Sequence, residues 1–208
     1  MISHKHRCIF IHIPRSGGSS LEDVIWPEPR READLWMGFV SPHSNRYQTG
    51  GLQHLTARLV REVVGQRVFN EYFKFTFVRN PWDKAISQFA YLSQRRDLRR
   101  FLGAPEGLSF SDYLDRIGSC AHVQWSPQYD FLYDENGEPL VDFVGRFERL
   151  TEDARTVFEH LGVSCPVLPH TRASAHPPYA TYYNDHARRR IQDLYAKDIS
   201  EFNYHFTG

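Results

Sequence analysis

The 208-residue sequence has little cysteine, no net charge and no long apolar segment. Its three cysteines, Cys8, Cys120 and Cys165, are odd in number and irregularly spaced, which indicates reduced thiols rather than a disulfide framework. No paired C-x-x-C occurs, so we expect no bound metal. Basic and acidic residues number 25 each, so the net charge is zero. A chain without net positive charge is not expected to attract nucleic acid by its overall electrostatic potential.

The apolar run near the beginning of the chain ends at Pro14 and contains His12. It is too short and too polar for a secretory signal or a membrane span, so a cytoplasmic, bacterial protein is the simplest expectation. Its hydrophobic content of 41% is ordinary for a globular protein, and its length suffices for one sizeable core. We therefore predict a single domain over residues 1–208.

Residues 8–22 form the most informative segment, because they read as a buried strand, a loop of small residues and the start of a helix. Such a loop presents backbone N–H groups at a helix N-terminus, where an anion is favoured. Gly17 and Gly18 allow close approach of a phosphate to the backbone, and Arg15 adds a fixed positive charge. Ser19 and Ser20 add hydroxyl donors. The segment predicts a phosphate-binding loop.

The loop departs from the pattern of ATPases, G-x-x-x-x-G-K-[ST], in which lysine contacts the terminal phosphates and the last hydroxyl binds magnesium. Here the two glycines are adjacent, and no Lys-Ser or Lys-Thr pair follows them. The two usual anchors of a metal-bound nucleoside triphosphate are therefore missing.

A second informative segment is residues 72–87. Its aromatic and β-branched first half predicts a buried strand, and Asn80 and Pro81 then mark a helix start as N-cap and first helical residue. Arg79 follows the strand directly, and Ser87 lies two turns into the helix. Ligands of open α/β sheets bind at the carboxyl ends of strands, which is where both Arg15 and Arg79 are expected.

These residues resemble the sulfotransferases that use 3′-phosphoadenosine-5′-phosphosulfate (PAPS), with bacterial and carbohydrate sulfotransferases nearest. The family's 5′-phosphosulfate loop reads roughly P-K-T-G-G-T-S, and its 3′-phosphate site reads R-x-P-x-x-x-x-x-S. Similarity continues through residues 142–148 and 194–199. The resemblance implies a 5′-phosphosulfate site at Pro14, Arg15, Ser16, Gly17, Gly18, Ser19 and Ser20, and a 3′-phosphate site at Arg79 and Ser87.

One residue of the loop differs from the family pattern, which usually has lysine where this chain has Arg15. The resemblance implies that this cation stabilises the bridging oxygen as sulfate leaves. Arginine supplies charge and hydrogen bonds but does not release a proton near neutral pH. We therefore expect Arg15 to stabilise the leaving group electrostatically without acting as a general acid.

Sulfuryl transfer also requires a base, and His54 is the leading candidate because it precedes a helix that Thr56 is expected to cap. An imidazole titrates close to neutral pH, and glycan 2-O-sulfotransferases are similar in using a histidine base. Glu22 and Asp23, one turn into the helix after the loop, are the alternative bases, and His43 is a third choice. Each also has a structural interpretation, since acidic residues favour a first helical turn and a histidine can simply bond a helix N-terminus.

The loop around Arg172 and Ser174 resembles the family segment that closes over the cosubstrate, where both residues would contact the 3′-phosphate. The reaction so implied moves a sulfuryl group from PAPS to an acceptor hydroxyl, on a glycan or a small molecule, without a metal. Two alternatives stay open: a P-loop-type small-molecule kinase, and a non-catalytic nucleotide- or glycan-binding module.

Strand and helix signals alternate along the chain, which predicts an α/β fold. With the resemblance, we expect a three-layer sandwich around a mostly parallel sheet, similar to P-loop NTPases. A hairpin is expected between strands 131–133 and 140–144, with its turn at 134–137, and Thr151 is expected to cap a helix. The predicted helices are 18–25, 57–64, 82–95, 110–117, 151–161 and 185–202.

Overall fold

The computed structural model describes residues 1–27, 51–164, 167–168 and 178–207, and its contacts divide the chain into two compact units. The first unit lies within Met1–Val78 and Gln128–Arg172, and the second within Arg79–Pro127 and Ala173–Gly208. Both units are therefore built from two separate stretches of chain. That the chain forms a single domain stays a prediction.

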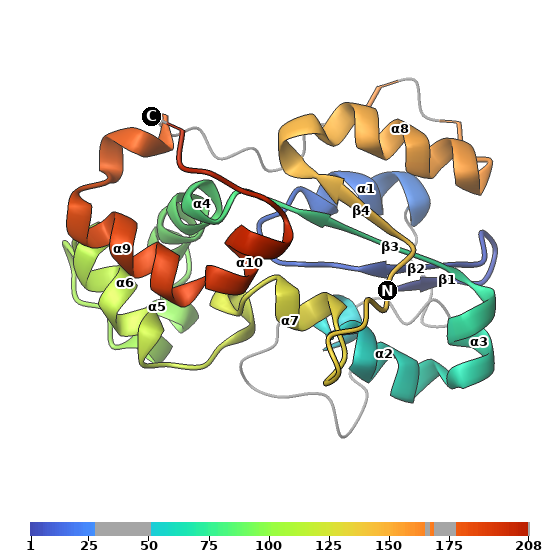
Figure 1. The fold of residues 1–208 in the computed structure, drawn as a ribbon, viewed down its shortest axis with the longest axis horizontal. Helices are drawn as coiled ribbons and strands as arrows, with labels where there is room; N and C mark the ends of the chain where they lie inside the picture. Colours follow the sequence, from blue (N-terminus) through green and yellow to red (C-terminus); the bar gives the residue numbers. More distant parts are fainter. Residues whose placement is uncertain (28–50, 165–166, 169–177, 208) are drawn as a thin grey trace. The chain divides into compact units, whose positions relative to one another are not determined.

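A mixed four-stranded sheet forms the centre of the first unit (Figure 1). Its order follows the sequence, with β1 antiparallel to β2, and β2, β3 and β4 parallel to one another. The register pairs Cys8 with Phe73 and Phe75 with Phe143. The strands are β1 (Ile2–Ser3), β2 (Cys8–Ile11), β3 (Phe73–Val78) and β4 (Phe143–Arg146).

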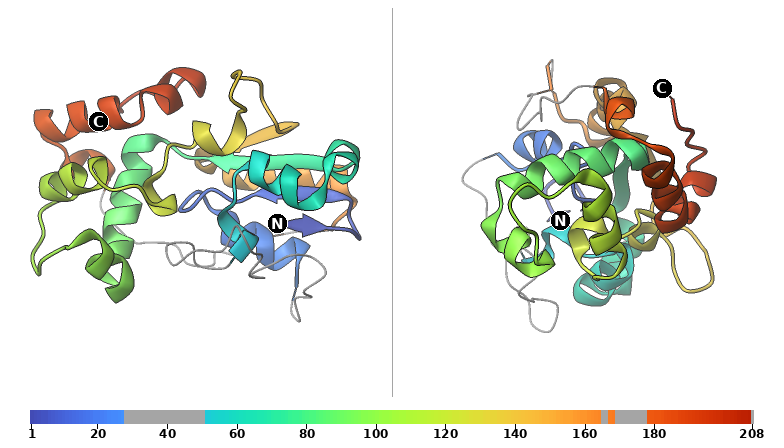
Figure 2. Two further views of the ribbon diagram at one scale, coloured as in Figure 1. Left: turned by 90° about the horizontal axis from the view of Figure 1, so that it is seen from below. Right: turned by 90° about the vertical axis from the view of Figure 1, so that its left-hand side faces the viewer.

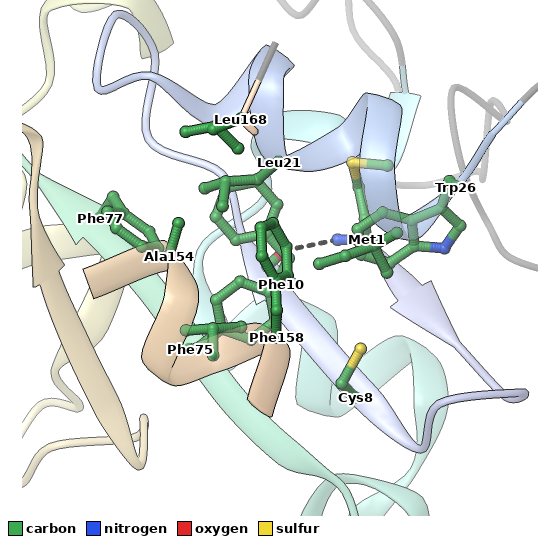
Figure 3. Close-up of a cluster of buried hydrophobic side chains, with 12 residues drawn as sticks. Met1, Cys8, Phe10, Leu21, Trp26, Phe75, Phe77, Ala154, Phe158 and Leu168 are labelled. Atoms are coloured by element: carbon green, nitrogen blue, oxygen red, sulfur yellow. Dashed lines mark hydrogen bonds between the residues drawn. The ribbon is translucent and has the colours of Figure 1, made fainter. Parts of the chain in front are cut away.

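Helices cover both faces of this sheet, as expected for an α/β sandwich: α1 and α8 lie on one face, and α2 and α3 on the other (Figures 1 and 2). Side chains alternate across a strand, so Cys8 and Phe10 point to the same face and pack with α1 and α8 (Figure 3). The helices of this unit are α1 (Gly18–Ile25), α2 (Ala57–Val64), α3 (Gln66–Glu71), α7 (Tyr129–Leu132) and α8 (Leu150–Leu161), with the 3-10 turns η2 (Gly51–His54) and η4 (Phe147–Arg149).

In the second unit, every regular element of the described residues is a helix or a 3-10 turn. Its first helix, α4, starts as its sequence predicts, because the Asn80 side chain accepts a hydrogen bond from the backbone N–H of Trp82 at 3.0 Å and Pro81 occupies the first turn. Its helices are α4 (Pro81–Ser93), α5 (Arg96–Leu102), α6 (Phe110–Gly118), α9 (Asp185–Leu194) and α10 (Ala196–Glu201), with the 3-10 turns η3 (Val123–Trp125) and η5 (Tyr179–Tyr182).

Three expectations about secondary structure were wrong. The helix predicted over 185–202 is two helices, with a break at Tyr195. The Tyr195 side chain is buried and continues the helical spacing of apolar residues, so the sequence gives no sign of the break. The predicted hairpin does not form, because residues 131–133 lie largely in α7 and only Tyr133 makes a bridge, to Pro139; its second strand is β4, which begins at Phe143 and pairs in parallel with β3. Thr151 does not cap α8, because a 3-10 turn runs into the helix and α8 begins at Leu150.

Candidate active site

The phosphate loop, residues 14–20, connects β2 to α1 as the sequence predicts. Two of its residues have positive φ angles: Arg15, at 66°, and Gly17, at 83°. Gly17 makes no side-chain cap, and the first turn of α1 contains no acidic residue. The N-cap residue of α1 therefore offers no side-chain acceptor to the N–H groups of this turn, and the helix dipole there favours an anion.

The two glycines of the loop are required by packing as well as by conformation. A Cβ at Gly17 would lie 2.9 Å from Cδ2 of Leu150, in addition to the strain of its positive φ. A Cβ at Gly18 would lie 2.3 Å from Cδ2 and Nε2 of His12. The His12 ring thus lies directly against the loop where α1 begins.

The polar side chains of the phosphate loop differ in accessibility. Ser16 is buried, and its hydroxyl donates a long hydrogen bond of 3.5 Å to Oε1 of Gln128. Ser20 is also buried, whereas Arg15 and Ser19 are half-buried. Arg15 and Ser19 are consequently the loop side chains with most access to a ligand, and Ser16 has a structural contact.

His54 ends η2 and is 7% exposed. Thr56 caps α2 as expected, with its side chain accepting from the N–H of Leu59 at 3.3 Å. Nδ1 of His54 lies 3.0 Å from the backbone carbonyl oxygen of His12. Because a carbonyl oxygen only accepts, Nδ1 carries the proton, and the lone pair of the neutral ring is on Nε2.

Burial, assisted by the nearby charge of His12, lowers the pKa of His54 to about 3. The hydrogen bond to the His12 carbonyl and the charge of Glu22 act in the opposite direction and raise it. His54 is consequently neutral across the physiological pH range, and a pKa so far below neutral makes its ring a weaker proton acceptor than an exposed imidazole.

Glu22 is 2% exposed and belongs to the same buried cluster as His54. Its Oε1 lies 2.6 Å from Nδ1 of His12, and both of its oxygens accept from Nε2 of Gln53 at 3.2 Å. The contact with His12 is short but poorly aligned for a hydrogen bond, so charge attraction dominates it. We refer to His12, Glu22, Gln53 and His54 as the His–Glu cluster.

Arg79 lies in the second unit, immediately after β3 in the sequence. It is 5% exposed, and its Nε donates to Oδ2 of Asp83 at 2.7 Å. Ser87, one further turn along α4, is fully buried. The spacing of Arg79, Asp83 and Ser87 by four residues places them along one side of the start of α4.

Lys84, next to this row, is a buried cation that the sequence analysis did not single out. It is 2% exposed, and Nζ donates to the carbonyl oxygen of Ser126 at 3.3 Å. Burial lowers the pKa of Lys84 to about 8, although the charge of Asp198 raises it. Asp198 belongs to the family-like segment 194–199, so that segment contributes a buried charge next to α4.

The structure thus gathers two candidate bases, His54 and Glu22, in one cluster, and the third, Asp23, is half-buried on the same helix as Glu22. Arg172, Ser174 and His43 lie outside the described residues. The sequence analysis missed His12 and Gln53. His12 was detectable in principle, since it continues the alternation of Cys8 and Phe10 and therefore falls on the face that α1 covers.

Among the described residues, no helix is long and apolar enough to cross a membrane. In the same part of the chain, no group of three or more His, Cys, Asp or Glu side chains is placed to hold a metal ion. Cys8 and Cys120 form no disulfide bond.

Comparison with known proteins gives a consistent assignment. The chain is 24% identical to carbohydrate sulfotransferase 10 of Xenopus laevis, in an alignment that covers 98% of this chain and 66% of the frog protein. It is 33% identical over 110 residues to an uncharacterized protein of Archaeoglobus fulgidus, which covers 52% of this chain and 83% of that protein. No solved structure matches. The model of the sulfotransferase family matches residues 1–205, and the chain therefore belongs to that family.

Proposed function

We propose that this protein transfers the sulfuryl group of PAPS to a hydroxyl group, with a carbohydrate as the acceptor class. The observation that carries the proposal is the phosphate loop. Its glycines and its position at the start of α1 suit a phosphosulfate, and it lacks the lysine–hydroxyl pair of a triphosphate site. The acceptor class is suggested by the similarity to the frog carbohydrate sulfotransferase. A cytoplasmic, bacterial setting stays a prediction.

In this proposal the residues of the phosphate loop hold the 5′-phosphosulfate, and Arg79 and Ser87 hold the 3′-phosphate. Arg172 and Ser174 are proposed to add contacts to the 3′-phosphate. When bound, PAPS supplies an activated sulfuryl group whose leaving group is a phosphate oxygen. No metal is needed for this function, because the arginine charges and the backbone N–H groups supply the positive potential that a phosphate requires.

The chemical roles follow from protonation states. His54 accepts the proton of the acceptor hydroxyl at Nε2 while the hydroxyl oxygen attacks sulfur. Arg15 and the N–H groups of the first turn of α1 stabilise the charge that develops on the leaving oxygen. Arg15 stays protonated throughout, since guanidinium does not deprotonate in proteins.

Two rival functions make different predictions. A small-molecule kinase would bind Mg-ATP in preference to the bisphosphate product of PAPS, and a non-catalytic module would bind that product without turning over.

The test is incubation of the purified protein with PAPS and acceptors of four classes: glycans, lipids, tyrosine peptides and small metabolites. Mass spectrometry should detect the gain of one sulfate on a glycan. Absence of sulfated product from every class, together with phosphorylation by Mg-ATP, would overturn the proposal.

A further inference from the structure

The Glu22 carboxylate joins three segments of the first unit. Glu22 itself lies on α1, one turn after Gly18, where the phosphate loop ends. Gln53, in η2, donates to both of its oxygens, and His12, just after β2, lies 2.6 Å from Oε1. A single buried group therefore connects the helix after the loop to the residue that precedes His54.

Glu22 is poorly suited to act as a base itself. Burial alone raises its pKa, but the close contact with the charge of His12 and the hydrogen bonds from Gln53 outweigh burial and lower the pKa to about 2. Both oxygens are already occupied by Gln53, so a proton accepted there would displace existing contacts. A carboxylate in this environment stays ionised and serves its partners as an acceptor and a negative charge.

The same cluster reaches the base and the phosphate loop through His12. The His12 carbonyl holds the proton of His54 on Nδ1, and the His12 ring lies against the backbone of Gly18. The rings of His12 and His54 are also in edge contact, with centroids 4.7 Å apart. A displacement of Glu22 would therefore move the base relative to the loop, and misplacement of about 1 Å can cost about 10²-fold in rate.

We propose that Glu22 is a positioning residue. With Gln53 and His12, it fixes His54 in its Nδ1-protonated form and holds the His54 ring at a set position relative to the phosphate loop. This inference rests on the proposed function for its catalytic consequence, but the orientation of His54 is open to test without any substrate. The negative charge of Glu22 has a second effect, since it favours the imidazolium that forms when His54 takes a proton.

The test compares Glu22→Gln, Glu22→Ala, Gln53→Ala and the double variant E22A/Q53A. Glu62→Gln is the matched control, because Glu62 is an exposed carboxylate on helix α2. Binding of 3′,5′-adenosine bisphosphate (PAP) is measured by calorimetry, and sulfate transfer is measured with the acceptor that the screen identifies. The tautomer of each histidine is read from ring ¹⁵N shifts in histidine-labelled protein.

We expect Gln53→Ala and Glu22→Ala each to lower kcat about tenfold to a hundredfold, with the Kd for PAP within about threefold of wild type. The double variant should be no slower than the slower single variant, because the two residues act through one contact. His54 should lose its single Nδ1–H tautomer in both alanine variants and keep it in Glu22→Gln. If Glu22→Ala fails to fold, Gln53→Ala and Glu22→Gln carry the comparison.

Two results would overturn the inference. One is an unchanged His54 tautomer in both Gln53→Ala and Glu22→Ala. The other is loss of all transfer in Glu22→Gln with wild-type rates in Gln53→Ala and His54→Ala, which would make Glu22 the base. Failure of the proposed function has a separate signature, namely no PAP binding and no transfer by the wild-type protein whatever the His54 tautomer.

Discussion

Nδ1 of His54 lies 3.0 Å from the backbone carbonyl oxygen of His12, and the two residues are 42 positions apart in the sequence. This contact determines which ring nitrogen of His54 can accept a proton, because a carbonyl oxygen cannot donate. The pKa of His54, lowered to about 3 by burial, keeps that nitrogen unprotonated at neutral pH. The His12 carbonyl, just after β2, therefore leaves Nε2 as the ring nitrogen of His54 that can accept a proton.

Replacement of His54 by alanine should abolish most sulfate transfer and leave cosubstrate binding intact. General base catalysis contributes about 10²–10⁴-fold, so we expect kcat to fall within that range. Steady-state transfer assays and PAP calorimetry measure the two effects separately. His186→Ala, at an exposed histidine of α9, is the control. Unchanged turnover in His54→Ala would move the base to Glu22 or Asp23.

Substitution of Arg15 should separate charge from proton donation. Arg15→Ala removes the cation that we propose lies next to the leaving group, and we expect kcat to fall about 10²–10³-fold. Arg15→Lys keeps the charge and restores the usual family residue, so most of the activity should return. Both variants keep a side chain at the same positive φ, so backbone strain is matched. Equal loss in the two variants would show that the guanidinium geometry, and not the charge, is what matters.

Replacement of Arg79 should remove recognition of the 3′-phosphate. Charge-assisted hydrogen bonds are worth about 1.5–3 kcal/mol, which corresponds to about tenfold to a hundredfold in affinity. We expect Arg79→Gln to weaken PAP binding by that factor while binding of adenosine 5′-monophosphate, which lacks the 3′-phosphate, is unchanged. Parallel weakening of both ligands would contradict a specific role for Arg79.

The His–Glu cluster should make the free energy of unfolding decrease as the pH is lowered. The pKa of His54 is about 3 in the fold and about 6.5 when unfolded, so the unfolded chain binds a proton that the folded chain excludes. The free energy of unfolding should fall by about 1.4 kcal/mol per pH unit from this group as pH drops below 6.5. Glu22, with its pKa lowered to about 2, adds stability above pH 4.5 that is lost as the pH falls further.

Urea unfolding at a series of pH values measures this dependence. Replacement of His54 by glutamine should reduce the pH dependence of the free energy of unfolding below pH 6.5 by about 1.4 kcal/mol per pH unit, which is the contribution of one proton. Equal slopes for the variant and wild type would mean that His54 takes up its proton in the folded state.

Local signals predicted much of the secondary structure. The bounds of α1 and α2 were predicted correctly, because a small-residue loop precedes α1 and a threonine cap precedes α2. The break at Tyr195 was missed, since the buried spacing of residues continues through it. Residues 131–133 were misassigned, because a short aromatic run is compatible with either a strand or a helix.

The site was predictable only where its residues are contiguous. The phosphate loop and the Arg79–Ser87 row are each read within a few residues of sequence, whereas the His–Glu cluster depends on three segments that meet through tertiary packing. Gln53 carries no local signal of its contact with Glu22, 31 positions away. The positive φ of Arg15 was likewise unforeseen, because left-handed conformations are expected of glycine.

The choice between a phosphosulfate site and a triphosphate site is the central question, and comparative calorimetry of PAP and Mg-ATP tests it most directly. Use of PAPS predicts that PAP binds selectively and without magnesium, and raises the unfolding temperature more than Mg-ATP does. Tighter binding of Mg-ATP than of PAP would contradict the sulfuryl-transfer function.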